Sequence, residues 1–284
     1  MKMHCNSCDG IYRSFDVHFT SACDNKCAHC IDKQYEGSHI CKPDVNAIVE
    51  TIVENQEGME DVLFLGGEPC LYLKELYACV RKLKERTNLK LYITTSVPKT
   101  CYDNYELFCE IIKKVDGINL SVQHYDETIA DFIRGTSSQY DRQRFYAGLP
   151  YKSKIRININ LVNPYLSTQE DIIQCLKHYD SMGFNTIKLG ELQQGYGAYA
   201  SFEKAFGIKL GSPYANGCQT YLDMKKIIPD FKTRVLLKRS CFLCEETLKA
   251  HPIDGIKVIA KLLSSKEGKH GVVWENGNIT GGWA

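Results

Sequence analysis

The chain contains 284 residues, of which 44% are hydrophobic and 24% are charged, and its formal net charge is +1. These proportions are ordinary for a globular protein and exclude an intrinsically disordered or membrane-embedded chain. The near balance of charge provides no electrostatic footprint for nucleic acid, and the N-terminus has no apolar signal segment, so we expect a cytoplasmic protein without membrane contact.

Short runs rich in branched and aromatic residues alternate with helical patterns along the first two thirds of the chain. Six runs predict β-strands, in chain order Tyr12–Thr20, Asp61–Leu65, Lys90–Thr95, Gly117–Val122, Lys154–Val162 and Thr186–Leu189. Apolar residues spaced for one buried face predict helices at Asp44–Asn55, Leu73–Arg86, Tyr105–Val115 and Thr168–Met182. This alternation predicts an α/β fold with a parallel sheet, arranged as a partial (β/α)6 TIM-like barrel.

The alternation ends after the sixth predicted strand, and the remaining chain predicts a smaller unit. Its expected elements are a strand at Arg234–Lys238, a short helix at Glu245–Ala250 and a hairpin in which Val272–Trp274 and Asn278–Thr280 flank an Asn-Gly turn. The predicted organisation is an N-terminal segment at 1–11, a barrel at 12–210 and a cysteine-containing α+β extension at 211–284.

Three cysteines lie on one short loop after the first predicted strand, in the stretch Cys23-Asp-Asn-Lys-Cys27-Ala-His-Cys30. The chain carries 14 cysteines without a signal peptide, which favours thiols and metal ligands over disulfides. Three thiolates on a loop at the mouth of a barrel can ligate three corners of a [4Fe-4S] cube and leave the fourth iron open. The alternatives are a zinc knuckle or three unrelated buried thiols, although zinc favours a fourth protein ligand nearby.

This C-x3-C-x2-C spacing at a strand end resembles the signature of the radical S-adenosylmethionine (SAM) superfamily. The resemblance implies that Cys23, Cys27 and Cys30 ligate a [4Fe-4S] cluster and that SAM chelates the open iron. It places His29 at the position before the last cysteine, which lies near the adenine of SAM in this family. The alternative for His29 is simple packing against the loop.

A second stretch follows the second predicted strand and is similar to the GGEP motif of the same family. It consists of Gly66, Gly67, Glu68 and Pro69. Glycines allow the backbone to approach a ligand closely, and carbonyl groups or Glu68 can accept hydrogen bonds from a cation. The match implies contacts from this stretch to the methionine ammonium group of SAM.

Polar residues at the remaining strand ends are candidates for two roles. The resemblance implies contacts to the ribose or carboxylate of SAM from Ser96, Ser121, Gln123, Asn158 and Asn160. The candidates that face a substrate are Lys188, Glu191 and His124. For each residue the alternative is a hydrogen bond satisfied inside the barrel.

Further cysteines predict a second metal centre. The extension carries Cys218, Cys241 and Cys244, which resemble the auxiliary-cluster segment, called a twitch, of many radical SAM enzymes. Three ligands leave one site short, so Cys5 or Cys8 would complete the cluster. Alternatively, Cys5 and Cys8 form a zinc site with Cys241 and Cys244, or these residues are free thiols.

The sequence therefore predicts an enzyme whose cluster reductively cleaves SAM to a 5′-deoxyadenosyl radical, which abstracts hydrogen from a substrate. The predicted substrate is a small molecule, nucleotide or short peptide, and the electron donor a flavodoxin or ferredoxin. One alternative is a maturase that modifies ribosomally made peptides. An alternative of another class is a non-catalytic zinc or thiol-rich binding protein.

Overall fold

The computed structural model describes residues 12–27, 30, 42–160, 165–166, 169–184, 186–190, 234–235, 247–249, 257–261 and 268–281. Its strands are β1 (Tyr12–His18), β2 (Asp61–Leu65), β3 (Lys90–Thr95), β4 (Gly117–Val122), β5 (Ile155–Asn160), β6 (Thr186–Gly190), β7 (Arg234–Val235), β8 (Thr247–Lys249), β9 (Lys257–Lys261), β10 (Gly268–Trp274) and β11 (Ile279–Thr280). Its α-helices are α1 (Val45–Asn55), α2 (Leu73–Arg86), α3 (Lys99–Asp103), α4 (Tyr105–Lys114), α5 (Glu127–Arg134), α6 (Arg142–Gly148) and α7 (Gln169–Ser181). Two 3₁₀ helices, η2 (Pro69–Tyr72) and η3 (Lys152–Lys154), complete the described elements.

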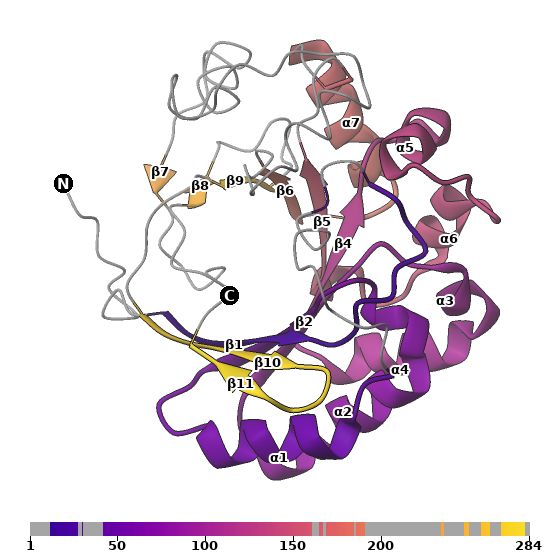
Figure 1. The fold of residues 1–284 in the computed structure, drawn as a ribbon. Coiled ribbons are helices and arrows are strands. Elements are labelled where there is room, and N and C mark those ends of the chain that lie inside the picture. Colours follow the sequence, from indigo (N-terminus) through magenta and orange to yellow (C-terminus); the bar gives the residue numbers. More distant parts are fainter. Residues whose placement is uncertain are drawn as a thin grey trace.

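The strands form one curved sheet in the order β11-β10-β1-β2-β3-β4-β5-β6-β9-β8-β7. Strands β1 to β6 are parallel and adjacent in chain order, and the helices lie on the outer side of the curve (Figure 1). This arrangement confirms the predicted α/β fold and partial barrel. Because the strands are parallel, their carboxyl ends, where the motifs lie, meet at one rim.

The two faces of the sheet differ in polarity, and β5 shows this most plainly. Its isoleucines, Ile155, Ile157 and Ile159, are buried, whereas the intervening residues are half-buried. Side chains alternate between the faces of a strand, so the isoleucines pack beneath the outer helices and the polar residues line the concave face. The concave face is therefore available for polar contacts.

Local sequence signals account for the ends of the helices. Asp44 caps α1 by accepting hydrogen bonds from the main-chain nitrogens of Asn46 and Ala47. Asp126 caps α5 in the same way, and Gly135 ends α5 in the left-handed conformation with φ of 66°. None of the helices within the described residues is both long enough and apolar enough to cross a membrane.

The C-terminal strands join the barrel sheet at both of its edges. Strand β9 pairs in parallel with β6, and β10 pairs in parallel with β1. The predicted hairpin is confirmed, because β10 and β11 are antiparallel and Gly277 in the turn has φ of 84°. The division into segments 1–11, 12–210 and 211–284 stays a prediction.

The predicted helix at Glu245–Ala250 is wrong. Residues Thr247–Lys249 form β8, which pairs antiparallel with β9. Thr247 is β-branched and favours a strand, and pairing with a partner distant in sequence overrides the weak helical preference of so short a stretch. The sequence prediction also did not define α3, α5 and α6, which are all short helices of eight residues or fewer.

Candidate functional site

The cysteine loop begins where β1 ends, at the rim of the barrel. Cys23 is exposed, Cys27 and Cys30 are half-buried, and none of the three forms a disulfide bond. The main-chain nitrogen of Asn25 donates to Cys23 Sγ at 3.4 Å, and the nitrogen of Cys30 donates to the carbonyl oxygen of Cys27 at 3.2 Å. The loop thus folds back on itself and presents its thiols within eight residues of chain.

Three thiols on one loop match the ligand chemistry of a [4Fe-4S] cube. Within the described residues, no group of three or more His, Cys, Asp or Glu side chains is arranged to hold one metal ion. A [4Fe-4S] cube spreads its thiolates over separate iron corners, so the ligands need not converge on one point. Although Cys23 is exposed as a residue, the protein atoms around its sulfur desolvate the thiol and, with a smaller contribution from Glu68, raise its pKa, so iron binding must displace its proton.

The GGEP loop is bonded to the cysteine loop through its main chain. The nitrogen of Gly67 donates to the carbonyl oxygen of Thr20 at 2.6 Å, and the nitrogen of Glu68 donates to that of Ala22 at 2.8 Å. Gly66 has φ of 111°, a conformation that favours glycine. A Cβ atom on Gly67 would lie 2.8 Å from the carbonyl carbon of Ala22. The two loops are therefore in direct main-chain contact, and this close contact requires glycine at positions 66 and 67.

The Glu68 side chain is buried beneath the rim and hydrogen-bonded by the protein. Its Oε1 accepts from Thr95 Oγ1 at 2.6 Å and from the nitrogen of Cys70 at 3.0 Å. Its Oε2 accepts from both the nitrogen and the hydroxyl of Ser96 at 2.7 Å. Burial raises the pKa of Glu68, and these four donors oppose the shift. Here the carboxylate ties β2 to β3, while Pro69 begins η2 immediately after it.

Ser96 connects the GGEP loop to the cysteine loop. Its hydroxyl donates to Glu68 and accepts a hydrogen bond from Asn25 Nδ2 at 2.7 Å. The next residue, Val97, is fully buried and has φ of 58°, an unfavourable conformation for a β-branched residue. Such strain persists only where surrounding contacts impose it, and it is concentrated at functional sites.

The polar residues of β4, β5 and β6 form a row across the concave face. Ser121 pairs with Asn158, and Asn158 pairs with Lys188, so the three side chains lie side by side on one face. Arg156 lies two residues before Asn158 and its Nε donates to Asn158 Oδ1 at 3.2 Å. Asn160 follows on the same face, at the end of β5. The row offers hydrogen bonds and two cations to a bound molecule.

Several buried oxygen atoms at the rim have no hydrogen-bond donor among the described residues: Ser21 Oγ, Asn25 Oδ1 and Gln123 Oε1. Gln123 follows β4 and is only 6% exposed. An unsatisfied buried acceptor is costly, and a ligand that carries N–H and O–H groups would satisfy it. Ammonium, amino and ribose hydroxyl groups are donors of this kind, so the rim fits SAM.

His124 is engaged by the main chain at both ring nitrogens. Its Nδ1 accepts from the nitrogen of Asp126 at 2.9 Å, which leaves Nε2 to donate to the carbonyl oxygen of Tyr165 at 3.3 Å. Desolvation lowers the pKa of His124, which favours the neutral ring. These contacts favour a role in holding the loop after β4, and its contact with a substrate stays a prediction.

Several predicted site residues lie outside the described residues. They are His29, Glu191, Cys5, Cys8, Cys218, Cys241 and Cys244. Their predicted roles, including the auxiliary cluster and the alternative zinc site, stay predictions.

The sequence prediction did not identify a buried pair at the end of β1. His18 is fully buried, its Nδ1 lies 3.1 Å from Glu275 Oε2, and its ring lies 5.0 Å from that of Trp274. A Cβ atom on Gly66 would lie 3.2 Å from His18 Cδ2. The pair thus joins the C-terminal hairpin to the GGEP loop, and only the long-range pairing of β10 with β1 reveals it.

A cavity of about 820 Å³ lies beside the cysteine loop. Lys26 and residues of α5 and the loop that follows it line this cavity, with Phe132 and Tyr140 among them. The described residues that line it do not include the polar row on β4, β5 and β6.

Comparisons with known proteins agree with this geometry. Residues 17–188 match the family model described as the Radical SAM superfamily. The chain is similar to the tRNA-2-methylthio-N(6)-dimethylallyladenosine synthase of Vesicomyosocius okutanii, with 23% identity over 212 residues, 70% of this chain and 45% of that protein. The synthase of Acidovorax sp. (strain JS42) is also 23% identical, over 223 residues that cover 70% of this chain and 44% of that protein. The chain spans less than half the length of these curated relatives.

A solved structure shows the same fold. Streptococcus suis SuiB bound to S-adenosylmethionine aligns with a TM-score of 0.58 and 15% identity, over 96% of this chain and 60% of that chain. The family model spans more than half of this chain and includes both the three-cysteine loop and the GGEP loop. The chain belongs to the radical SAM superfamily of enzymes.

Proposed function

We propose that Cys23, Cys27 and Cys30 hold a [4Fe-4S] cluster whose fourth iron binds SAM beside the GGEP loop. The observation that carries this assignment is the pair of main-chain hydrogen bonds that join Gly67 and Glu68 to the cysteine loop. They bring the motif with the predicted ammonium contacts against the loop with the predicted iron ligands. Membership of the radical SAM superfamily makes the chain an enzyme and not a non-catalytic zinc protein.

A bound cluster would supply the electron for reductive cleavage of SAM, the chemistry that starts hydrogen abstraction from the substrate. The residues of this chain bind and orient SAM and the substrate, and they exclude water from the site. Glu68 and Ser96 fix the spacing between the loops through hydrogen bonds of 2.7 Å. Asn25 Oδ1 and Gln123 Oε1 supply acceptors for donor groups of SAM.

The substrate is a polar small molecule, nucleotide or short peptide that lies against the concave face. The polar row of Ser121, Asn158 and Lys188 supports this class, because it offers both hydrogen bonds and a cation on adjacent strands. Arg156 adds a second cation on the same face. We therefore expect the substrate to carry an anionic group such as a carboxylate or phosphate.

A peptide maturase is the second candidate. One solved structure of SuiB is bound to the precursor peptide SuiA, and it aligns with a TM-score of 0.59 over 96% of this chain. At 15% identity this similarity concerns the fold, so the peptide substrate is a proposal only. A flavodoxin or ferredoxin as the electron donor, and a second cluster held by Cys218, Cys241 and Cys244, are further proposals.

Anaerobic purification and reconstitution test the cluster assignment. We expect the unmodified protein to be brown. In Cys27→Ala the content of iron and sulfide should fall by the amount in about one [4Fe-4S] cluster, because a cube held by two thiolates does not persist. Cys109→Ser is the matched control, since Cys109 is a half-buried thiol on α4. Equal iron contents in Cys27→Ala and the unmodified chain would overturn the assignment.

The substrate class is tested by offering the reduced enzyme four panels with SAM: acidic small metabolites, nucleotides, unmodified tRNA and short peptides. Turnover is measured as a substrate-dependent rise in 5′-deoxyadenosine together with a mass change in the added molecule. We expect a rise with an anionic small molecule, a nucleotide or a peptide. A rise with tRNA alone would contradict the proposed class.

A further inference from the structure

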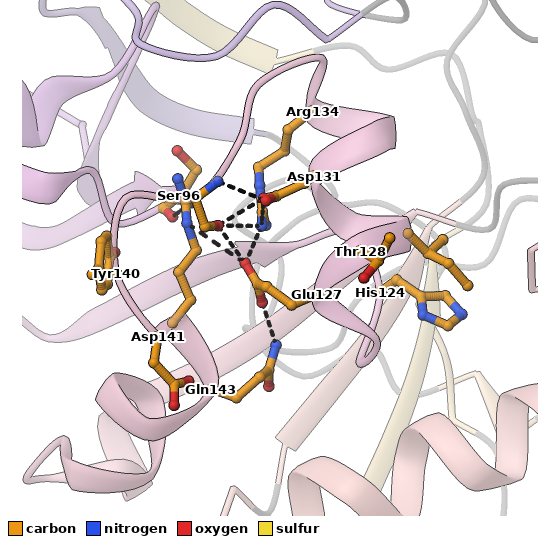
Figure 2. Close-up of polar contacts among 12 residues, drawn as sticks. Ser96, His124, Glu127, Thr128, Asp131, Arg134, Tyr140, Asp141 and Gln143 are labelled. Atoms are coloured by element: carbon orange, nitrogen blue, oxygen red, sulfur yellow. Dashed lines mark hydrogen bonds and ion pairs between the residues drawn. The ribbon is translucent and has the colours of Figure 1, made fainter.

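A partly buried network of charged and polar side chains joins α5 to α6 and to the loop between them (Figure 2). Arg134 is 1% exposed, and its Nη2 donates to Glu127 Oε1 and, at 2.8 Å, to Asp131 Oδ1. The hydroxyl of Ser138 lies 2.6 Å from Glu127 Oε1, and Gln143 Nε2 donates to Glu127 Oε2 at 3.0 Å. Glu127 is therefore the residue on which the network converges.

The network reaches the cysteine loop by a first route through the end of α5. The carbonyl oxygen of Arg134 accepts a hydrogen bond of 2.8 Å from the nitrogen of Lys26, which directly precedes Cys27. Gly135 has φ of 66°, and a Cβ atom there would lie 2.8 Å from the carbonyl oxygen of Lys26. The cysteine loop thus rests directly on the C-terminal turn of α5.

A second route runs through α6 to the same loop. Arg142 is 3% exposed, its Nε lies 3.8 Å from Glu127 Oε1, and its Nη1 donates to the carbonyl oxygen of Ser96 at 2.9 Å. The hydroxyl of Ser96 accepts from Asn25, the neighbour of Lys26. Arg134 thus links Glu127 to Lys26, and Arg142 links Glu127 to Asn25 by way of Ser96.

The second route also accounts for the strained turn after β3. The Tyr140 hydroxyl donates to the carbonyl oxygen of Val97, while Arg142 holds that of Ser96. The nitrogen of Val97 donates to Thr95 Oγ1 at 2.9 Å. Backbone strain of this kind costs roughly 1–3 kcal/mol per residue and persists only when several contacts impose it. The contacts of the network therefore hold the strained turn, and this turn places Ser96 within hydrogen-bonding distance of Asn25 and Glu68.

We propose that Glu127 is a positioning residue that sets the geometry of the cluster loop, and with it the affinity for SAM. The inference rests on the proposed function, because it presumes that Cys23 and Cys27 ligate the cluster. Both arginines are buried, and Glu127 is the carboxylate shared between them. Loss of that charge leaves the arginines incompletely compensated and releases the two contacts at residues 25 and 26 together.

The test compares Glu127→Gln with the unmodified chain by electron paramagnetic resonance of the reduced, reconstituted enzyme during a titration with SAM. Glutamine keeps the shape of the side chain and removes its charge. We expect full iron content and a cooperative thermal transition, together with a rise of at least tenfold in the SAM concentration that half-perturbs the spectrum. Glu85→Gln, which removes the carboxylate of the exposed Arg81–Glu85 pair, should leave that concentration unchanged.

Arg142→Lys supports the test if Glu127→Gln fails to fold. Lysine keeps a cation beside Glu127 but cannot reach Ser96 with the same fork of donors, so we expect a weaker shift in the same direction. A lowered melting temperature with an unchanged SAM titration, in whichever variant folds, would overturn the proposal and leave Glu127 a structural residue. Failure of the unmodified enzyme to respond to SAM would instead contradict the proposed function.

Discussion

The side-chain amide of Asn25 donates a 2.7 Å hydrogen bond to the hydroxyl of Ser96, and this contact joins the loop after β1 to the end of β3. The same hydroxyl donates to Glu68. One oxygen atom therefore connects the cysteine loop, the GGEP loop and the strained turn at Val97.

Removal of that oxygen should loosen the rim. In Ser96→Ala, Asn25 loses its acceptor and Glu68 loses one of its donors, so we expect a loss of about 1–3 kcal/mol in the free energy of unfolding. Urea denaturation of the apo protein measures the change. Ser181→Ala is the control, because Ser181 is exposed at the end of α7. A loss in Ser96→Ala no larger than in the control would contradict the role of Ser96.

The close approach of the two loops should make Gly67 intolerant of any side chain. In Gly67→Ala the added Cβ meets the main chain of Ala22, and neither loop can move without breaking the hydrogen bonds between them. We expect a loss of about 1–3 kcal/mol in stability and a lower iron content after reconstitution.

Gly148→Ala is the matched control for the glycine test, because Gly148 ends α6 and a Cβ atom there meets nothing within 4 Å. Alanine is the better helix former, so this variant should be neutral or more stable by up to about 1 kcal/mol. Equal iron contents in the two alanine variants would contradict the interlocking of the loops.

The pair formed by His18 and Glu275 should hold the C-terminal hairpin against the barrel. Glu275→Ala removes the carboxylate that lies 3.1 Å from the buried His18 Nδ1, and we expect a loss of about 1–3 kcal/mol in the free energy of unfolding. Glu275→Gln keeps an acceptor oxygen and should lose less. If Glu275→Ala is as stable as the alanine variant of the exposed Glu54, the pair contributes nothing to stability.

The half-buried Asp61 at the start of β2 predicts a pH dependence of stability. Desolvation raises its pKa from 3.8 to about 7. Between these two pH values the folded state therefore keeps a proton that the unfolded state has already released. The contribution of this proton to stability is present below about pH 4 and is lost as pH rises to about 7.

Asp61→Asn removes this dependence. The difference in the free energy of unfolding between the variant and the unmodified chain should grow, in favour of the variant, as pH rises from 5 to 8. We expect this growth to be on the order of 1–2 kcal/mol, after allowance for the partial exposure of Asp61. Denaturant titrations at the two pH values measure the gain. If the difference between the variant and the unmodified chain is the same at pH 5 and at pH 8, the Asp61 carboxyl does not titrate in this range.

Sequence reasoning reached the parts of the site that are local in the chain. Cys23, Cys27 and Cys30 share one loop, and Gly66 to Pro69 share another, so spacing and strand position were sufficient to propose them as site residues. The six parallel strands were also predictable, because each carries its own run of branched residues.

The missed features depend on contacts between distant residues. Glu275 meets His18 only because β10 pairs with β1, and no local pattern encodes that pairing. Glu127 lies on a helix of eight residues, too short to give a clear periodicity, and its importance arises from two arginines that follow it at different distances. The hydrogen bond from Ser96 to the Glu68 carboxylate likewise joins the ends of two strands, and no local pattern reveals it.

The central claim is that three thiols on one loop hold an iron site that cleaves SAM. The most direct measurement is 5′-deoxyadenosine formation by the anaerobically reconstituted, dithionite-reduced enzyme, quantified by mass spectrometry for the unmodified chain and for Cys23→Ala, Cys27→Ala and Cys30→Ala. We predict product from the unmodified chain and from the control Cys109→Ser, and none above background from the three alanine variants. Product from any of those three, at the rate of the unmodified enzyme, would contradict the claim.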